Sequence, residues 1–290
     1  MNAPERLRSA RMGSAIGDIL VSRGLLREDD IPRVIAHQRE KRLPFGEAAI
    51  ALRLIQRGDL ESALAKQFNY GYLQDASDGL SRELVTAYKP FSNVAEQMRA
   101  LRGQLMLRWF NGEPLRKVLT VVSHQPRDGR SFLVANLAVA FSQQGQRTLV
   151  IDGDLRRPRL HTLFKTEPSA GLAGVLAGRV GTEVIAQVPG LPGLRVLPAG
   201  TTPPNPQELV GSPALAELLD AAIAQHDVVL IDTPAGHDCA DAEILSARVG
   251  AAVLVARRNR TTLRGAREFA RRLQDTGVAL VGTEIGRAHV

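Results

Sequence analysis

The sequence has little of three things: cysteine, aromatic side chains and long apolar runs. Of its 290 residues, one is Cys, one is Trp and three are Tyr. The single Cys239 cannot form an internal disulfide, and it lacks the clustered partners of a zinc site. No apolar run approaches the roughly 18 to 20 residues that span a bilayer, and residues 1–13 lack the apolar core of a signal peptide. We therefore expect a cytosolic protein in a reducing compartment.

What is present is the composition of a folded globular chain. Hydrophobic residues make up 44% and charged residues 23%, which excludes collagen-like, coiled-coil and wholly disordered chains. The length suits a small domain and a larger one. The net charge of +7 would suit a nucleic-acid binder, but the few aromatic residues leave little on which bases could stack. We expect no nucleic-acid partner.

The positive charge is unevenly distributed. Residues 248–272 contain eight Arg and one acidic residue, Glu268. Such a stretch is either a solvated helix face or an interface with an acidic or phosphate-bearing partner.

The N-terminal part contains a repeat offset by 29 residues. Ile16-Gly17-Asp18 returns as Phe45-Gly46-Glu47, and Leu25-Leu26 returns as Leu54-Ile55. Each unit predicts a short helix, a turn and a second helix, giving an all-α module over residues 14–72. The module resembles the N-terminal module of type II secretion and pilus ATPases. Some of those bind cyclic-di-GMP through an Arg that Ala15 and Pro44 replace here, so we expect protein docking or packing instead.

Helices and strands are expected to alternate in the larger domain. Residues 73–92 are turn-rich and predict a linker, and residues 93–110 predict a helix. Apolar runs typical of buried strands, some separated by helical stretches, then follow at Val118–Val122, Leu149–Asp152, Leu194–Leu197, Val228–Asp232 and Ala252–Val255. This pattern predicts an α/β fold, a mostly parallel doubly wound sheet with ligands at the carboxyl ends of its strands.

Three polar segments follow these predicted strands. The first, residues 123–131, precedes a helix predicted over Ser131–Gln143, a position in which backbone N–H groups can cradle a phosphate. A P-loop would have Gly at 124 and Lys at 130, whereas this loop has His124 and Arg130. Taken alone, the loop matches a P-loop weakly, and an ordinary strand-to-helix turn is the favoured interpretation.

The other two segments carry acidic residues. Asp152 and Asp154 lie two apart at a strand end, and therefore on one face. Paired acids beside a phosphate loop can hold Mg²⁺ and accept a proton. Asp232 ends another apolar strand, where P-loop enzymes keep a metal-organising Asp. The presence of all three segments in this order argues against a chance match to a phosphate-binding site.

With these motifs, residues 84–282 resemble the bacterial tyrosine kinases of polysaccharide export, relatives of the MinD and ParA P-loop ATPases. Three aliphatic residues followed by Asp-x-Asp-x-Arg match residues 149–156, and three aliphatics followed by Asp-x-x-Pro match residues 229–234. With the helical module in front, the EpsG-type branch, associated with chain-length determinants, is the most similar.

The resemblance implies an ATP-dependent tyrosine autokinase that uses ATP and Mg²⁺. The nucleotide would be bound by Asp128, Gly129, Arg130, Ser131, Phe132 and Asp232. The metal would be held by Ser131, Asp154 and Asp232, and catalysis would involve Asp152 as base together with Asp154 and Arg130. Arg127 and Arg130 replace the family's Gly and Lys. Arg is longer and planar, and Arg127 adopts positive φ less readily than Gly.

The resemblance also implies partners. Glu96, Arg99 and Arg102 match the family's Glu-x-x-Arg-x-x-Arg motif for ring assembly, although their helical spacing also fits a solvated stripe. The expected partner is the cytosolic segment of a membrane chain-length determinant, a polysaccharide co-polymerase. It would hold this cytoplasmic chain at the inner membrane and couple it to exopolysaccharide chain length and export.

The last residues are expected to be foreign. Residues 285–290 match the translation of a sequencing-library adapter, so we predict that the natural sequence stops near residues 282–284 and that the kinase domain, residues 93–284, is truncated.

Two other functions stay open at this point. One is a nucleotide-binding scaffold without kinase activity, which the altered loop allows. The other is a MinD- or ParA-like ATPase, which the full Asp-x-Asp-x-Arg motif disfavours.

Overall fold

The computed structural model describes residues 16–67, 73, 79–113, 116–167 and 171–286. The chain divides into two units, residues 1–74 and residues 75–290. Among the described residues, no helix combines the length and the apolar character needed to cross a bilayer.

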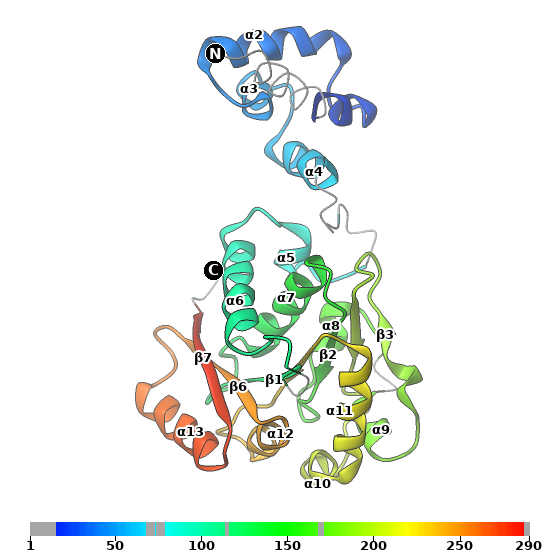
Figure 1. Cartoon of the computed structure of the whole chain (residues 1–290), viewed down its shortest axis with the longest axis vertical. Helices are drawn as coiled ribbons and strands as arrows, with labels where there is room; N and C mark the ends of the chain where they lie inside the picture. Colours follow the sequence, from blue (N-terminus) through cyan, green and yellow to red (C-terminus); the bar gives the residue numbers. More distant parts are fainter. Residues whose placement is uncertain (1–15, 68–72, 74–78, 114–115, 168–170, 287–290) are drawn as a thin grey trace. The chain divides into compact units, whose positions relative to one another are not determined.

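The first unit consists of short helices around a small apolar core (Figure 1). Residues 16–22 are helical, and they are followed by the 3-10 turn η1 (Glu28–Asp30) and by α2 (Ile31–Lys41), α3 (Phe45–Ala51) and α4 (Arg57–Gln67). Leu20, Val34, Phe45 and Ala63 are among the buried core residues. The helix, turn, helix order expected from the repeat is confirmed within these residues.

The repeat extends to individual backbone hydrogen bonds. Leu25 N–H donates to Leu20 C=O, and Leu54 N–H, 29 positions later, donates to Ala49 C=O, each over 3.0 Å. Gly24 has φ +69° and its counterpart Arg53 has φ +57°, so both turns use the left-handed conformation. The two 29-residue repeats therefore form the same turn, even though Arg53 occupies a position that favours Gly.

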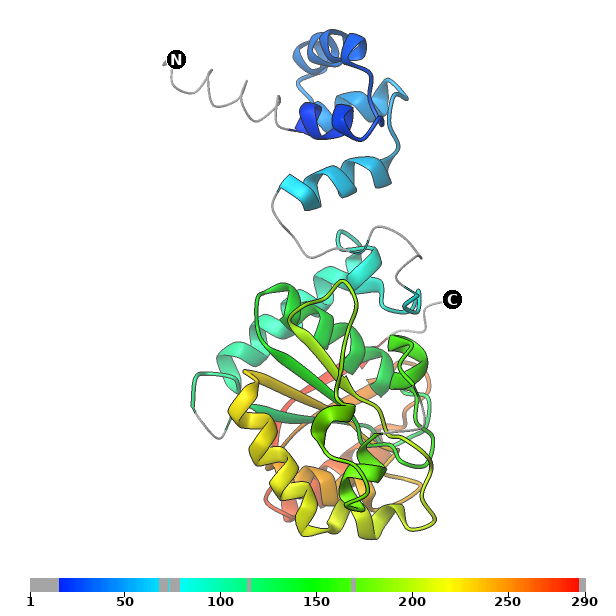
Figure 2. The ribbon, with the colours of Figure 1, turned by 90° about the vertical axis from the view of Figure 1, so that its right-hand side faces the viewer.

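The second unit is a seven-stranded sheet with helices on both faces (Figures 1 and 2). Its order is β3-β4-β2-β5-β1-β6-β7, and every pair is parallel except β3 with β4. The strands are β1 (Val118–Val122), β2 (Thr148–Asp152), β3 (Ala186–Gln187), β4 (Leu194–Leu197), β5 (Val228–Asp232), β6 (Ala251–Arg257) and β7 (Ala279–Gly286). The predicted α/β fold is confirmed.

Two helical layers cover the sheet. On one face, α7 (Arg130–Gln143) contacts β1, β2, β4 and β5 and carries the helices α5 (Val85–Tyr88), α6 (Asn93–Arg108) and α8 (Leu160–Phe164). The other face carries α9 (Leu172–Leu176), α10 (Pro206–Gly211), α11 (Pro213–Gln225), α12 (Asp241–Val249) and α13 (Leu263–Asp275), and the 3-10 turn η3 (Thr182–Val184) precedes β3.

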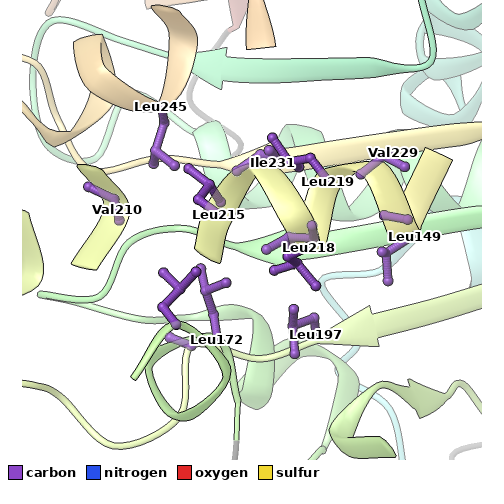
Figure 3. Packing of buried hydrophobic residues seen from close by; sticks show 14 of the residues in the cluster. Leu149, Leu172, Leu197, Val210, Leu215, Leu218, Leu219, Val229, Ile231 and Leu245 are labelled. Carbon is purple, nitrogen blue, oxygen red and sulfur yellow. The ribbon is translucent and has the colours of Figure 1, made fainter. Parts of the chain in front are cut away.

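The central strands are apolar on both sides because both sides are covered. Every residue of β1, β2 and β5 is buried. Figure 3 shows Leu215, Leu218 and Leu219 of α11 packed towards Leu149 of β2 and Ile231 of β5. This core holds the carboxyl ends of β2 and β5 side by side.

Residues 79–92 pack against α7 within the second unit, although the sequence predicted a linker over 73–92. Leu84 and Ala87 are fully buried, and the Thr86 N–H donates to Oδ1 of Asn136 in α7 over 2.9 Å. The Asn136 amide donates in turn to the Glu83 C=O, also over 2.9 Å. The turn-forming residues of this segment therefore concealed its packing, which the buried Asn136 of α7 secures.

The last strand extends beyond the point at which the natural sequence was expected to stop. β7 includes Ile285 and Gly286, which pair with Ala256 and Arg257 of β6. Residues 287–290 lie outside the described residues.

Gly46 provides a test of the helical unit. A Cβ at Gly46 would overlap the side chain of Leu60, whereas a Cβ at Gly58 meets nothing within 4 Å. We predict that Gly46→Ala lowers the free energy of local unfolding of this unit by about 1–3 kcal/mol, as overpacked cores do. Gly58→Ala should leave it unchanged or raise it by about 0.5–1 kcal/mol. Hydrogen exchange of residues 31–67 in the full chain measures both, and equal exchange in the two variants would contradict the packing.

Candidate functional site

The three polar segments meet at one edge of the sheet. The loop 123–131 follows β1, Asp152 ends β2 and Asp232 ends β5. Asp152 and Asp232 are register partners across the β2–β5 pair, and Asp232 is also paired with Val121 of β1. The predicted convergence at the carboxyl ends of parallel strands is therefore present.

The loop has the left-handed turns of a phosphate cradle. Gly129 has φ +102°, and Arg127 has φ +63° although it stands where the family has Gly. A non-Gly residue in this conformation costs about 1–2 kcal/mol. Nη1 of Arg257, at the end of β6, donates to the Arg127 C=O over 3.2 Å. Asp128 is buried, and its Oδ2 accepts the Gln125 N–H over 3.2 Å, so this acid holds the loop together.

The Arg130 side chain points into the protein. Its Nε donates to the Thr233 C=O over 2.7 Å, and its Nη1 donates to the Gln125 C=O over 2.9 Å and to the Ser123 hydroxyl. The side chain thus joins both ends of the loop to the residue after Asp232. The sequence predicts that this charge binds the phosphates, which stays a prediction, and in the structure the side chain braces the loop from within.

The carboxylate of Asp152 is fully buried. Its Oδ2 accepts the backbone N–H groups of Arg159 and Leu160 over 2.9 and 2.8 Å. Burial, followed by the charge of Asp232, raises the pKa of Asp152 well above its usual value. A carboxylate in this environment has an increased affinity for a proton.

Asp232 and Asp154 complete the acidic group. Burial raises the pKa of Asp232, while the charge of Arg130 and a hydrogen bond from the Ser131 hydroxyl lower it. Oδ1 of Asp154 accepts the N–H groups of Arg156 and Arg157 over 3.2 and 2.9 Å, and 8% of this residue is exposed. Phe132 is half-buried on the first turn of α7.

His124 contributes packing to the site. Its ring lies 5.3 Å from that of His237 and 6.3 Å from that of Phe269, between centroids. Burial and then the charge of His237 lower the pKa of His124. The imidazole is therefore neutral at physiological pH and adds no positive charge to the loop.

Gly153 is a site residue that sequence reasoning missed. Its N–H donates to the Asp232 C=O over 2.9 Å, and a Cβ there would lie 2.6 Å from the same oxygen. Only Gly lets the ends of β2 and β5 approach this closely. The signal was available, because Gly153 stands between the two acids of Asp-x-Asp.

The residues predicted for oligomerisation make contacts within the chain. Arg99 donates to Glu96 Oε2 and to the Pro90 C=O, and Arg102 donates to the Ala140 C=O of α7 over 2.7 Å. The Glu96 side chain is 71% exposed and that of Arg99 is 21% exposed. Of these three residues, only Glu96 has a largely exposed side chain.

Tyr88 is buried, with its hydroxyl bonded to the Leu80 C=O over 3.2 Å. The remaining tyrosines, Tyr70 and Tyr72, lie outside the described residues. Within the described part of the chain, no tyrosine is presented for modification.

Comparison with known proteins identifies relatives of this chain by sequence. No family model matches it. YwqD of Bacillus subtilis, a tyrosine-protein kinase, is 38% identical over 176 residues, which cover 61% of this chain and 73% of YwqD. EpsB of Ralstonia solanacearum is 36% identical over 219 residues, which cover 72% of this chain but 29% of EpsB. The chain thus spans less than a third of the length of that relative.

Solved structures with a similar fold include kinases and an ATPase. The kinase domain of the Escherichia coli tyrosine kinase ETK has a TM-score of 0.67 and 32% identity, covering 71% of this chain and 80% of that domain. The chimerical protein CapA2B2 has a TM-score of 0.66 and 29% identity, covering 78% and 97%. MinD of Pyrococcus horikoshii, complexed with Mg-ADP, has a TM-score of 0.51 and 25% identity, covering 58% and 68%.

Gly153→Ala tests the approach of the two strand ends. We predict that the added methyl group separates Asp152 from Asp232, lowers the free energy of unfolding by about 1–3 kcal/mol and weakens nucleotide binding. Gly211→Ala is the matched control, since a Cβ there meets nothing within 4 Å. Thermal unfolding and titration with a fluorescent ADP analogue measure both effects. A Gly153→Ala protein with wild-type stability and affinity would show that the close approach is unimportant.

Proposed function

This chain belongs to the bacterial tyrosine-protein kinases, and we propose that it is an autokinase. It would transfer the γ-phosphoryl group of ATP to tyrosine hydroxyl groups of the same protein. The observation that carries the proposal is the group formed by the loop 123–131, Asp152, Asp154 and Asp232 at one sheet edge. A loop at a helix N-terminus binds phosphates, and buried acids beside it serve a hydroxyl nucleophile.

The residues present fit a magnesium ion bound together with the nucleotide. Across the described part of the chain, no three His, Cys, Asp or Glu side chains form a complete metal site. Mg²⁺ does not need one, because it keeps several waters and takes one or two protein oxygens besides phosphate. The Ser131 hydroxyl with Asp232, and the less buried Asp154, supply such oxygens. When bound, the ion would neutralise charge on the transferring phosphate.

In the proposed reaction, a tyrosine oxygen forms a bond to the γ-phosphorus while the bond from that phosphorus to the β,γ-bridging oxygen breaks. The products are phosphotyrosine and ADP. The phenolic proton goes to Asp152, whose raised pKa increases its affinity for that proton. The loop N–H groups hold the phosphates, and Arg130 keeps the loop in shape through its bonds to Thr233 and Ser123.

The biological role that we propose is control of exopolysaccharide chain length and export beside a membrane co-polymerase. The cytosolic segment of that partner would keep this cytoplasmic chain at the inner membrane. Support comes from the family and from the CapA2B2 chimera among the structural neighbours.

Removing the two acids tests the proposed chemistry. We predict that Asp152→Asn with Asp154→Asn lowers transfer of labelled γ-phosphate to tyrosine at least about 100-fold, the scale of a lost base and metal ligand. The melting temperature at pH 7.5 should not fall, because the exchange removes a buried charge whose pKa is raised. Asp220→Asn, an exposed acid of α11, is the control. Nucleotide binding by the wild type without any transfer would instead identify a scaffold.

A homo-oligomeric ring is the proposed working assembly, with Glu96, Arg99 and Arg102 at the interface. Glu96→Gln is the cleanest test, because it removes the exposed charge and leaves the Arg99 bond to Pro90 in place. We predict that the wild type forms concentration-dependent higher oligomers and that Glu96→Gln shifts it to monomer. Sedimentation velocity measures this, with and without a cytosolic peptide of the membrane partner. A wild type that is monomeric at every concentration excludes the ring.

A further inference from the structure

Four arginines form a positive rim beside the phosphate loop. Arg127 belongs to the loop, Arg257 ends β6, and Arg258 and Arg260 belong to the turn that follows. Arg257 donates to the Arg127 C=O, and β6 lies next to β1 with Val122 paired to Leu254. The turn and the loop are therefore neighbours at the same edge of the sheet.

The turn is well ordered by its own hydrogen bonds. The Arg257 N–H donates to the Thr261 hydroxyl over 2.7 Å, and the Arg260 N–H donates to the Arg257 C=O over 3.1 Å. The Arg258 N–H donates to the Gly286 C=O of β7 over 2.9 Å. Because the backbone is fixed, a ligand that binds these side chains orders little more than the side chains themselves.

The rim has no acidic partners of its own. Within the described residues, no carboxylate lies within 4.0 Å of the charged nitrogens of Arg127, Arg257, Arg258 or Arg260, although nine other arginines of the second unit have such a partner. Two other acids of the second unit, Glu268 and Asp238, pair with Arg264 and, at 3.5 Å, with Arg157. Arg127, Arg258 and Arg260 are exposed.

The opposite side of the loop is acidic. Asp152 and Asp154 lie at the end of β2, and Asp232 lies at the end of β5. Across the order β2-β5-β1-β6, the buried acids thus lie on one side of the loop and the rim lies on the other. A segment that crosses this edge meets arginines without a carboxylate partner on the β6 side, whereas Arg156 and Arg157 beside Asp154 are paired with Asp241 and Asp238.

We propose that the rim formed by Arg127, Arg257, Arg258 and Arg260 selects the acceptor, which is a tyrosine segment carrying acidic residues at a distance from the tyrosine. This rests on the proposed kinase function. With the tyrosine at Asp152, the rim lies three strand spacings away, about 14 Å. An extended chain covers that distance in about four residues. The acids therefore belong about four to six positions from the tyrosine, rather than next to it.

The first test is binding, which does not depend on catalysis. Fluorescein-labelled peptides with one tyrosine carry three Glu at positions four to six from it, three Gln at the same positions, or three Glu directly beside the tyrosine. Anisotropy is measured with the full chain, Mg²⁺ and a non-hydrolysable ATP analogue. We expect the distant-Glu peptide to bind about fivefold more tightly than the other two at low salt. The difference should disappear at about 0.5 M salt, where the Debye length is only a few Å.

Two double variants locate the effect. Arg258→Gln with Arg260→Gln should abolish the preference for the distant-Glu peptide and leave the KM for ATP unchanged. Arg108→Gln with Arg271→Gln removes the same charge from α6 and α13 and should keep the preference. Equal binding of all three peptides to the wild type overturns the proposal, and so does a rim variant that retains the preference or changes the KM for ATP.

Kinetics separate this proposal from the kinase function on which it rests. Transfer to all peptides with one KM would leave the kinase in place and overturn the acidic acceptor. Selective binding with no transfer to any peptide or to the chain itself would support the rim as a binding site for acidic segments and reject the kinase function.

Discussion

The buried guanidinium of Arg130 is the interaction on which the site depends. It lies among three acceptors from two strand ends, the Ser123 hydroxyl and the carbonyl groups of Gln125 and Thr233. The same charge lowers the pKa of Asp232 against the effect of burial. Without this cation, Asp232 would lie buried beside the other acids with no opposite charge fixed next to it. The shape of the loop and the ionisation of Asp232 therefore have a common cause.

This arrangement explains why Arg can stand where the family has Lys. A planar guanidinium donates in several directions at once, whereas an ammonium group is a point charge on a flexible chain. The longer side chain reaches the Thr233 carbonyl across the strand end, and the left-handed turn at Arg127 is secured from outside by Arg257. Hydrogen bonds therefore stabilise the loop at both altered positions, Arg127 and Arg130.

The sequence could predict the sheet because its strands are apolar on both faces, and it could predict the site because Asp152 and Asp232 each end such a strand. It could not predict the packing of residues 79–92, since their turn-forming residues conceal the contact that Asn136 makes from α7. The direction of the Arg130 side chain was equally hidden. It depends on Ser123 and Thr233, which become neighbours only when β1 and β5 pair. Local patterns predict elements, and contacts between distant strands decide what the side chains do.

Hydrogen exchange in Arg130→Gln, without nucleotide, tests this account most directly. Gln is too short to reach the three acceptors and carries no charge, so exchange of residues 123–131 and 232–234 should accelerate at least about tenfold, which corresponds to a loss of 1.4 kcal/mol. Peptides from β6 and α13 serve as an internal reference and should exchange as in the wild type. Unchanged exchange of the loop in a variant with an intact sheet would show that Arg130 is not the brace, and that its charge is available to the nucleotide instead.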